Sequence, residues 1–388
     1  MALVASKSVD PFRIGVPDEV LDDLRERLHR TRLPARTDAE PWSLGTDVDY
    51  LRDLVGYWAD GFDWRATEAW LNGFPQYTAR IEGQLVHFAY LRTNPDPSAP
   101  PSIPIILTHG WPYTFVEMLD LVPYLVAPES HGGRPDDVFE VVVPSLPGYG
   151  FSEPFGERPF LRRTVATMWH HLMTDVLGYR RYATYGEDVG TSVSDWTAAL
   201  FPEHVIGLYS THAAFPPEDR REDLTPDEIA FREWLDEKWE RESAYSAIQA
   251  TKPDTLAAGL NDSPAGLLAW LVEKFRTWSG GESGFRRAWT DDQVLTTATL
   301  YWVTGTIGSS FRPYVDSRLE EGVPLIEVPV GVSVQWGERG FPRSYAERTY
   351  RDIRFWNDLP HGGHFTAKQT PDIVAADMRE FFRELRGV

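Results

Sequence analysis

The residues around position 188 have the spacing of a turn that carries a nucleophile between a strand and a helix. In Tyr185-Gly-Glu-Asp-Val-Gly-Thr191, glycines stand two residues before and two residues after Asp188. A tight strand-to-helix turn needs small residues at both places, because backbone segments come close together there. The turn presents its central side chain at a helix N-terminus, where backbone N–H groups stabilise negative charge. Asp188 is therefore the predicted nucleophile.

Two further polar residues follow later apolar runs, in the chain order nucleophile, acid, base. Glu338 comes just after VPVGVSVQW (328–336), and His364 comes just after DIRFWNDLP (352–360). Both runs have the character of buried strands, and parallel strands bring the residues at their ends to one edge of a sheet. We therefore expect Glu338, His364 and Asp188 to form a catalytic triad.

A second histidine, His361, stands three residues before His364 and is an alternative base. The two glycines between them favour His364, because a flexible glycine tip can project its ring. The same pair could suggest a metal site, but a glycine loop is not a helix and no third ligand is spaced with it. We expect no metal and no cofactor, since neither a Gly-rich dinucleotide motif after a strand nor a Walker loop occurs in the chain.

An aspartate nucleophile predicts a different reaction from that of a serine hydrolase. A carboxylate is already ionised at pH 7 and can attack a saturated carbon, which leaves an ester on Asp188. His364, oriented by Glu338, would then activate water to attack the ester carbonyl. Two backbone N–H groups, from Trp111 in HGWP and from Val189, would form the oxyanion hole for that second step. An epoxide or an alkyl halide is the natural electrophile for this chemistry.

Opening an epoxide ring also needs a hydrogen-bond donor for the leaving oxygen. Tyrosine suits this role because it is neutral at pH 7 and its hydroxyl can reach into an apolar pocket. The region that follows the predicted nucleophile leaves three candidates open: Tyr245, Tyr301 and Tyr314.

Composition limits the classes of partner. The 388 residues carry a net charge of -20, which would repel nucleic acids and anionic membranes. The lack of cysteine excludes disulfides, thiolate metal sites and a cysteine nucleophile. The weakly apolar run at the start of the sequence is too short for a signal-peptide core, and no apolar run is long enough for a membrane span. We expect a cytoplasmic enzyme whose partners are a small-molecule substrate and water, and a homodimer is left open.

The pattern of apolar residues divides the chain into four expected segments. The first holds helices beginning near Pro17 and Tyr50 and a strand over 84–90, and a proline-rich loop ends it. Apolar runs with strand character at 103–109, 138–145 and 181–185 then alternate with amphipathic helices, one of them over 163–177, which indicates a parallel α/β sheet. A long, purely helical stretch follows before strand character returns. The expected segments are 1–95 (N-terminal segment), 96–215 (core, first part), 216–318 (helical cap) and 319–388 (core, second part).

Several stretches resemble the microsomal-type epoxide hydrolase family of the α/β-hydrolase superfamily. WRATEAWLNGFPQYTARIEGQLVHFAYLR resembles its N-terminal segment, HGWP and LPGYGFSEP resemble its core, and AYSAIQATKPDTLAAGL and YWVTGTIGSSFRPY resemble its cap. The resemblance covers nearly the whole chain. It implies an α/β-hydrolase fold, with a helical cap insertion and an N-terminal segment that wraps onto the core.

The same resemblance implies a role for each matching residue. Asp188 would be the nucleophile, Glu338 the orienting acid and His364 the base, while Tyr245 and Tyr314 would be the two tyrosines that open the ring. The bacterial relatives include enzymes of natural-product pathways such as enediyne biosynthesis, an antibiotic pathway.

Two residues depart from the family's usual Gly-Gly-Asp-Trp-Gly turn. Glu187 puts a second carboxylate beside Asp188, and we expect it to point away because it would otherwise raise the pKa of the nucleophile. Val189 lacks the indole with which haloalkane dehalogenases bind the departing halide. It is also expected to widen the pocket beside Asp188.

The sequence therefore predicts an epoxide hydrolase that converts a bulky or aromatic epoxide into a vicinal diol through an ester on Asp188. A haloalkane dehalogenase is the first alternative, disfavoured by Val189 and by the tyrosine pair. A serine esterase lacks a serine at the turn. A non-catalytic binding protein on the same scaffold is the last alternative, and it would have no need of a complete triad.

Overall fold

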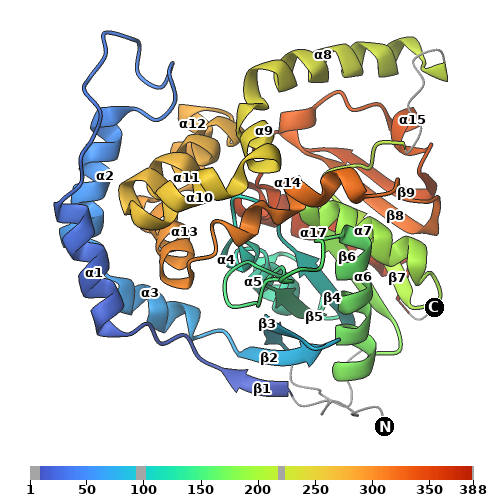
Figure 1. The fold of residues 1–388 in the computed structure, drawn as a ribbon. Coiled ribbons are helices and arrows are strands. Elements are labelled where there is room, and N and C mark those ends of the chain that lie inside the picture. The colour runs from blue at the N-terminus through green and yellow to red at the C-terminus, as the bar shows by residue number, and fades with distance from the viewer. Residues whose placement is uncertain (1–8, 93–101, 217–222, 387–388) are drawn as a thin grey trace.

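A nine-stranded sheet runs through the part of the chain that the computed structural model describes, residues 9–92, 102–216 and 223–386 (Figure 1). Its strand order is β1-β2-β3-β5-β4-β6-β7-β8-β9. The pairs from β5 to β9 are parallel, whereas β1, β2 and β3 pair antiparallel with their neighbours. The strands are β1 (Val9–Phe12), β2 (Gln76–Ile81), β3 (Gln84–Leu91), β4 (Ile103–Thr108), β5 (Phe139–Pro144), β6 (Tyr182–Gly186), β7 (Val205–Ser210), β8 (Ile326–Val334) and β9 (Tyr350–Asp358).

The helices of the core cover this sheet in two groups. Helices α6 and α7 pack together, and α7 also lies against β4, β6, β7 and β8. Helices α5 and α17 contact each other and pack on β5 and on β8 and β9, respectively. The core helices are α4 (Phe115–Met118), α5 (Val122–Val126), α6 (Arg162–His171), α7 (Val189–Leu200), α15 (Arg343–Ala346), α16 (Thr366–Gln369) and α17 (Pro371–Arg383).

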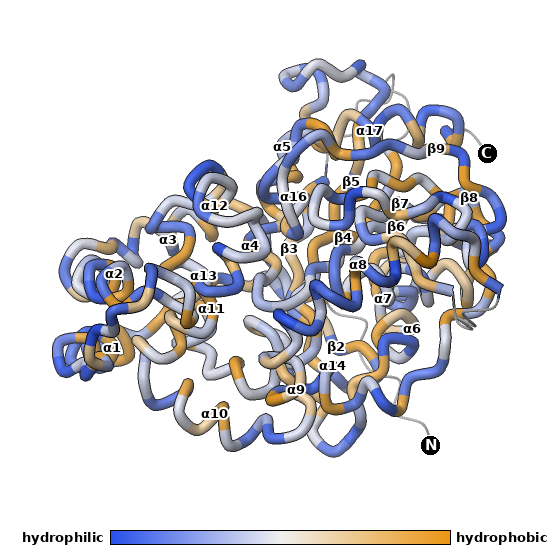
Figure 2. The backbone as a smooth tube through the Cα atoms, turned by 90° about the horizontal axis from the view of Figure 1, so that it is seen from above, coloured by the Kyte–Doolittle hydropathy of each residue, from blue (hydrophilic) through white to orange (hydrophobic). Residues whose placement is uncertain are grey.

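A purely helical insertion connects β7 to β8 and lies over one end of the strands (Figure 1). Its first helix, α8, is mostly hydrophilic in Figure 2, with Glu228 and Phe231 as its buried residues. The inner helices α11 and α13 carry long runs of buried residues. The insertion comprises α8 (Pro226–Glu242), α9 (Ala244–Thr251), α10 (Pro253–Asp262), α11 (Pro264–Trp278), α12 (Glu282–Ala288), α13 (Asp291–Thr304) and α14 (Arg312–Asp316).

The N-terminal helices α1 (Asp18–His29), α2 (Val48–Asp60) and α3 (Trp64–Leu71) pack against the helical insertion. In both views α11 and α13 lie between α1 and α2 and the sheet (Figures 1 and 2). The indole of Trp58 donates to the hydroxyl of Thr299 over 2.9 Å, and the hydroxyl of Thr46 donates to the carbonyl of Ala269 over 2.7 Å. These contacts tie the start of the chain to the insertion that covers the strand ends.

The predicted α/β class with a mostly parallel sheet is confirmed, and six strands fall where apolar runs indicated them. Strands β1, β2 and β7 were not predicted individually. The edge strand β1 contains Pro11, which is unusual within a strand, and β7 follows α7 after a short turn. The helix predicted over 163–177 is α-helical only to His171 and continues as a π-helical turn, Leu172–Val176.

Candidate active site

Asp188 stands at the turn between β6 and α7 in a backbone conformation that few non-glycine residues adopt. Its φ is 53° and its ψ is -123°. A Cβ atom on Gly186 would lie 2.0 Å from the carbonyl oxygen of Gly190, and one on Gly190 would lie 2.1 Å from that of Thr108. Both glycines are therefore required by close backbone contacts, which is the reason their spacing predicted this turn.

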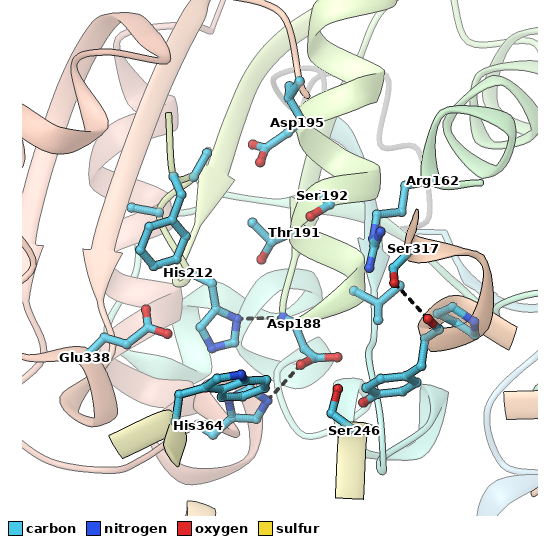
Figure 3. Close-up of a pocket in the computed structure, with 18 of the residues that line it drawn as sticks. Arg162, Asp188, Thr191, Ser192, Asp195, His212, Ser246, Ser317, Glu338 and His364 are labelled. Carbon is cyan, nitrogen blue, oxygen red and sulfur yellow. Dashed lines mark hydrogen bonds and ion pairs between the residues drawn. The ribbon is translucent and has the colours of Figure 1, made fainter. Parts of the chain in front are cut away.

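The carboxylate of Asp188 is held from two sides. The backbone N–H of Trp111 donates to Oδ1 over 3.0 Å, and the N–H of Val189 also hydrogen-bonds to the carboxylate. The Nε2 atom of His364 lies 3.4 Å from Oδ2 (Figure 3). Burial acts to raise the pKa of Asp188, but the His364 imidazole and the two N–H groups outweigh it, so the pKa is lowered. The side chain is therefore ionised at neutral pH.

His364 stands between β9 and α16 in a loop packed against the end of α11. Its backbone N–H donates to the carbonyl of Trp278 over 2.8 Å, and the two rings are 4.9 Å apart. A Cβ atom on Gly363 would lie 2.3 Å from that carbonyl oxygen. Gly363 therefore serves a close approach and not the flexibility that the sequence suggested. The alternative base, His361, is exposed and does not line the cavity described below.

Glu338 ends a short helical turn after β8 and faces the same cavity as His364 (Figure 3). Burial raises the pKa of its carboxyl, while the charges of Lys238 and His364 and a hydrogen bond from Gln335 oppose this rise. Lys238 comes from α8 of the insertion, where its Nζ donates to the carbonyl of Gly337 over 2.8 Å. The carboxylate thus lies within electrostatic reach of the imidazole.

Glu187 points away from the cavity, as the charge argument predicted. It is fully buried and accepts hydrogen bonds from the hydroxyls of Tyr185 and Thr366 and, over 2.6 Å, from the N–H of Ala367. Burial raises its pKa, although these donors and the charge of His364 act in the opposite direction. Glu187 joins the turn that carries Asp188 to the start of α16, just beyond His364.

Tyr245 from α9 and Tyr314 from α14 both line the cavity that contains Asp188. Their ring centroids are 5.8 Å apart, and Tyr245 also stacks on the indole of Trp111 at 5.3 Å and 7°. Burial raises the pKa of both hydroxyls, so both stay protonated at neutral pH and can donate. The third candidate, Tyr301, is buried but does not line this cavity.

The cavity has a volume of about 470 Å³, a size typical of a small-molecule site. Its wall next to the nucleophile includes the first turns of α7 (Figure 3). Besides the predicted residues, the apolar lining is Ala213, Ala214, Phe215, Trp239, Pro313 and Val323, and the polar lining is Arg162, Thr191, Ser192, Asp195, His212, Ser246 and Ser317.

His212 was not predicted, although it contacts both Asp188 and His364. Its Nδ1 atom accepts the backbone N–H of Asp188 over 2.6 Å, and its ring stacks on that of His364 with centroids 4.7 Å apart (Figure 3). It stands just beyond β7, an interior strand of the sheet that was not predicted. A strand over VIGLYS would have placed the following Thr-His pair at the same sheet edge as Asp188.

The structure also bears on metal binding and on membrane insertion. Within the described residues, no group of three or more His, Cys, Asp and Glu side chains is arranged to hold a metal ion. Over the same residues, no helix has the length and apolar character to cross a membrane.

Known proteins resemble the chain over nearly its full length. Residues 9–118 match the family described as the epoxide hydrolase N terminus. Epoxide hydrolase 1 of Sus scrofa is 33% identical over 414 residues, which cover 98% of this chain and 90% of that protein.

Solved structures give the same result. The juvenile hormone epoxide hydrolase of the silkworm Bombyx mori superposes with a TM-score of 0.85 at 30% identity, covering 99% of this chain and 96% of that one. The epoxide hydrolase of Aspergillus niger gives 0.83 at 30% identity, with 98% and 97% covered. With its α/β-hydrolase fold, the chain belongs to the microsomal-type epoxide hydrolase family, whose enzymes hydrolyse an ether bond.

Proposed function

We propose that the chain hydrolyses an epoxide to a vicinal diol through a covalent ester on Asp188. The observation that carries this proposal is that the two carboxylate oxygens of Asp188 have different neighbours. Oδ1 accepts the N–H of Trp111, a donor of the predicted oxyanion hole, and Oδ2 faces His364. A carboxylate held in this way can attack with one oxygen while the other becomes the ester carbonyl.

In the first step, Oδ2 of Asp188 attacks a ring carbon of the epoxide and the carbon–oxygen bond of the ring breaks. The ring oxygen leaves as an alkoxide and takes a proton from Tyr245 or Tyr314. Both hydroxyls are protonated because burial raises their pKa, and both line the cavity. The product is a hydroxyalkyl ester whose carbonyl oxygen is Oδ1.

In the second step, Nε2 of His364 removes a proton from water, and the hydroxide attacks the carbonyl carbon of the ester. Negative charge develops on Oδ1, to which the N–H of Trp111 donates, and the N–H of Val189, which also bonds to the carboxylate, is the second donor proposed for it. The carbonyl carbon then releases the diol oxygen, which regains a proton from the imidazolium. Asp188, regenerated as a carboxylic acid, gives up its proton, and the tyrosinate formed in the first step regains one, so the enzyme returns to its starting state. Glu338 stabilises the imidazolium through its charge.

The order of bond breaking predicts where the oxygen of water goes. Because water attacks the carbonyl carbon and not the substrate, a single turnover in ¹⁸O-water should label Asp188 and leave the first diol unlabelled. Direct attack of water on the epoxide would instead label the diol at once, and that result would refute the covalent mechanism.

We further propose a bulky or aromatic epoxide as the substrate, with natural-product biosynthesis as its setting. Support for the first part comes from the apolar lining, which includes Phe215 and Trp239, and from the small side chain of Val189 beside the nucleophile. A Val189→Trp variant should lose activity on large aryl epoxides more than on propylene oxide. Equal losses on both would contradict the role of Val189 in substrate size.

Trapping the intermediate tests the central proposal. His364→Gln should still form the ester with styrene oxide but should hydrolyse it slowly, so intact-mass analysis should find one added substrate mass. Peptide mapping should place that mass on Asp188. Asp188→Asn, treated in the same way, is the matched control and should gain nothing. An adduct at another residue, or diol formation by Asp188→Asn at the wild-type rate, would refute the assignment.

A further inference from the structure

His212 is a buried imidazole that the proposed mechanism does not use, although it contacts both the nucleophile's backbone and the base (Figure 3). We propose that His212 is a positioning residue with two separable tasks. Its Nδ1 holds the turn of Asp188, and its ring holds the plane of the His364 imidazole. This inference rests on the proposed two-step epoxide hydrolysis.

The loop that carries His212 is fixed by its own hydrogen bonds, so the ring has a defined position. The hydroxyl of Ser210 donates to the carbonyl of His212 over 2.8 Å and accepts its backbone N–H over 3.2 Å. Two residues further on, the N–H of Ala214 donates to the hydroxyl of Tyr350 over 2.9 Å. A side chain on such a short, anchored loop can hold its neighbours in place.

The first task is to accept a hydrogen bond. A backbone N–H carries one proton and can only donate, so Nδ1 must be unprotonated and the ring proton must be on Nε2. Burial lowers the pKa of His212 to about 3, and the charges of His364 and Lys238 act in the same direction, against the charge of Asp188 and a hydrogen bond with Gln335. His212 is therefore uncharged at neutral pH, and Nδ1 stays available as an acceptor.

This hydrogen bond stabilises a backbone conformation that is otherwise costly. Asp188 has a positive φ, and its part-buried N–H would have to find another partner if Nδ1 were absent. Relaxation of the turn would move the carboxylate away from the substrate carbon. Loss of the acceptor should therefore slow alkylation, the step in which Asp188 attacks.

The second task concerns the base. In the free enzyme, the charge of the Asp188 carboxylate attracts His364 across 3.4 Å. Alkylation converts this carboxylate into a neutral ester, so that attraction disappears just before His364 must activate water. The stacked ring of His212, at 28° to that of His364, does not depend on the charge of Asp188. Loss of the stack should therefore slow hydrolysis of the ester.

Two substitutions separate these tasks. In His212→Asn, the amide oxygen occupies nearly the position of Nδ1, so the acceptor remains while the ring is lost. In His212→Phe, the ring remains while the acceptor is lost. His361→Asn is the matched control, since His361 is exposed and outside the cavity.

The measurement is a single turnover of styrene oxide, quenched at short times and followed by intact mass, which gives the alkylation and hydrolysis rates separately. For His212→Asn we expect the ratio of hydrolysis to alkylation to fall about threefold to tenfold, from the strength of ring stacking. For His212→Phe we expect the ratio to rise about tenfold, from the loss of the part-buried hydrogen bond to the Asp188 N–H. His361→Asn should leave the ratio unchanged.

Opposite shifts of the ratio in the two variants would support the inference. A general loss of structure would slow both steps together, so an equal slowing of alkylation and hydrolysis in both variants would overturn the inference. If His212→Phe does not fold, an unchanged ratio in His212→Asn would overturn it.

Nitrogen-15 NMR adds a readout without substrate. Wild type should show a neutral imidazole protonated on Nε2 at pH 5, a signal that His212→Asn should lack, and a protonated His212 at that pH would also overturn the inference. A wild-type enzyme that forms neither ester nor diol would refute the proposed function itself.

Discussion

Replacing Glu187 tests how the turn of Asp188 is joined to the loop that carries His364. One carboxylate oxygen of Glu187 accepts three hydrogen bonds, from Tyr185, Thr366 and Ala367. Two substitutions distinguish the effect of the hydrogen bonds from that of the charge. Glu187→Leu removes both, whereas Glu187→Gln keeps an acceptor oxygen and removes only the charge.

The expected cost of Glu187→Leu follows from the number of donors that lose their acceptor. Each buried donor left without a partner costs about 1–3 kcal/mol. Because the three donors share one oxygen, their costs are not independent, and we expect a total near the lower end, about 3–5 kcal/mol. This is a large part of the roughly 5–15 kcal/mol by which a folded domain is stabilised. Glu187→Gln should stay within about 2 kcal/mol of wild type, since it orphans at most one group.

The pH dependence of this comparison has a definite sign. Burial raises the folded-state pKa of Glu187 above its ordinary value of 4.5. At pH values between the unfolded-state pKa and the raised folded-state pKa of Glu187, the native state binds more protons than the unfolded state. Glu187 therefore makes the wild type less stable as the pH rises through this range. Glutamine does not titrate. The stability of Glu187→Gln relative to wild type should therefore increase from about pH 4.5 upward and level off above the folded-state pKa.

Urea denaturation followed by tryptophan fluorescence, at several pH values between 4 and 8, measures both quantities. Steady-state turnover of styrene oxide shows whether the loop of His364 is still in place, and we expect Glu187→Leu to lose far more activity than Glu187→Gln. Two results would refute the reasoning. One is a Glu187→Leu variant as stable as wild type, and the other is a Glu187→Gln advantage that shrinks as pH rises.

Three further predictions concern the turn, the tyrosines and the nucleophile. Gly190→Ala should abolish activity and lower the melting temperature by more than 10 °C, because the new Cβ would lie 2.1 Å from a backbone oxygen. The control Gly259→Ala, which has open space around the new Cβ, should melt at the wild-type temperature or slightly above it. Tyr245→Phe and Tyr314→Phe should each slow ester formation by about tenfold, and the double variant by far more, in rapid-quench experiments that leave hydrolysis of preformed ester unaffected. In His364→Gln the pKa of Asp188 should be higher, because burial still raises it while the imidazole, the largest influence that lowers it, is gone. As the pH decreases, ester formation by this variant should therefore be lost at a higher pH than in wild type.

The parts of the site that the sequence predicted are those specified by local rules. The turn at Asp188 was predicted because two glycines at fixed spacing leave few other structures. Glu338 and His364 were predicted because each follows an apolar run of strand length. In each case a few consecutive residues carry the information, and the parallel sheet brings them together.

The parts that the sequence did not predict depend on pairs of residues far apart in the chain. A charge argument predicted the direction in which Glu187 points, but its partners Thr366 and Ala367 lie about 180 residues away, and no local pattern joins them. His212 was missed for a different reason, because the short strand before it was not predicted. The role of Gly363 was misjudged since the carbonyl that it approaches belongs to the helical insertion.

The base must keep one orientation while the carboxylate that faces it changes charge. In the free enzyme His364 faces a carboxylate, and after ester formation it faces a neutral group at the same place. Three contacts of its loop do not depend on that charge: the N–H of His364 bonded to Trp278, the start of α16 bonded to Glu187, and the ring stacked on His212. Because these contacts come from the insertion, from the turn after β6 and from the loop after β7, they hold the loop through three separate parts of the chain. Loss of any one of them should therefore affect hydrolysis of the ester more than its formation, except where, as at His212, the same residue also supports the nucleophile.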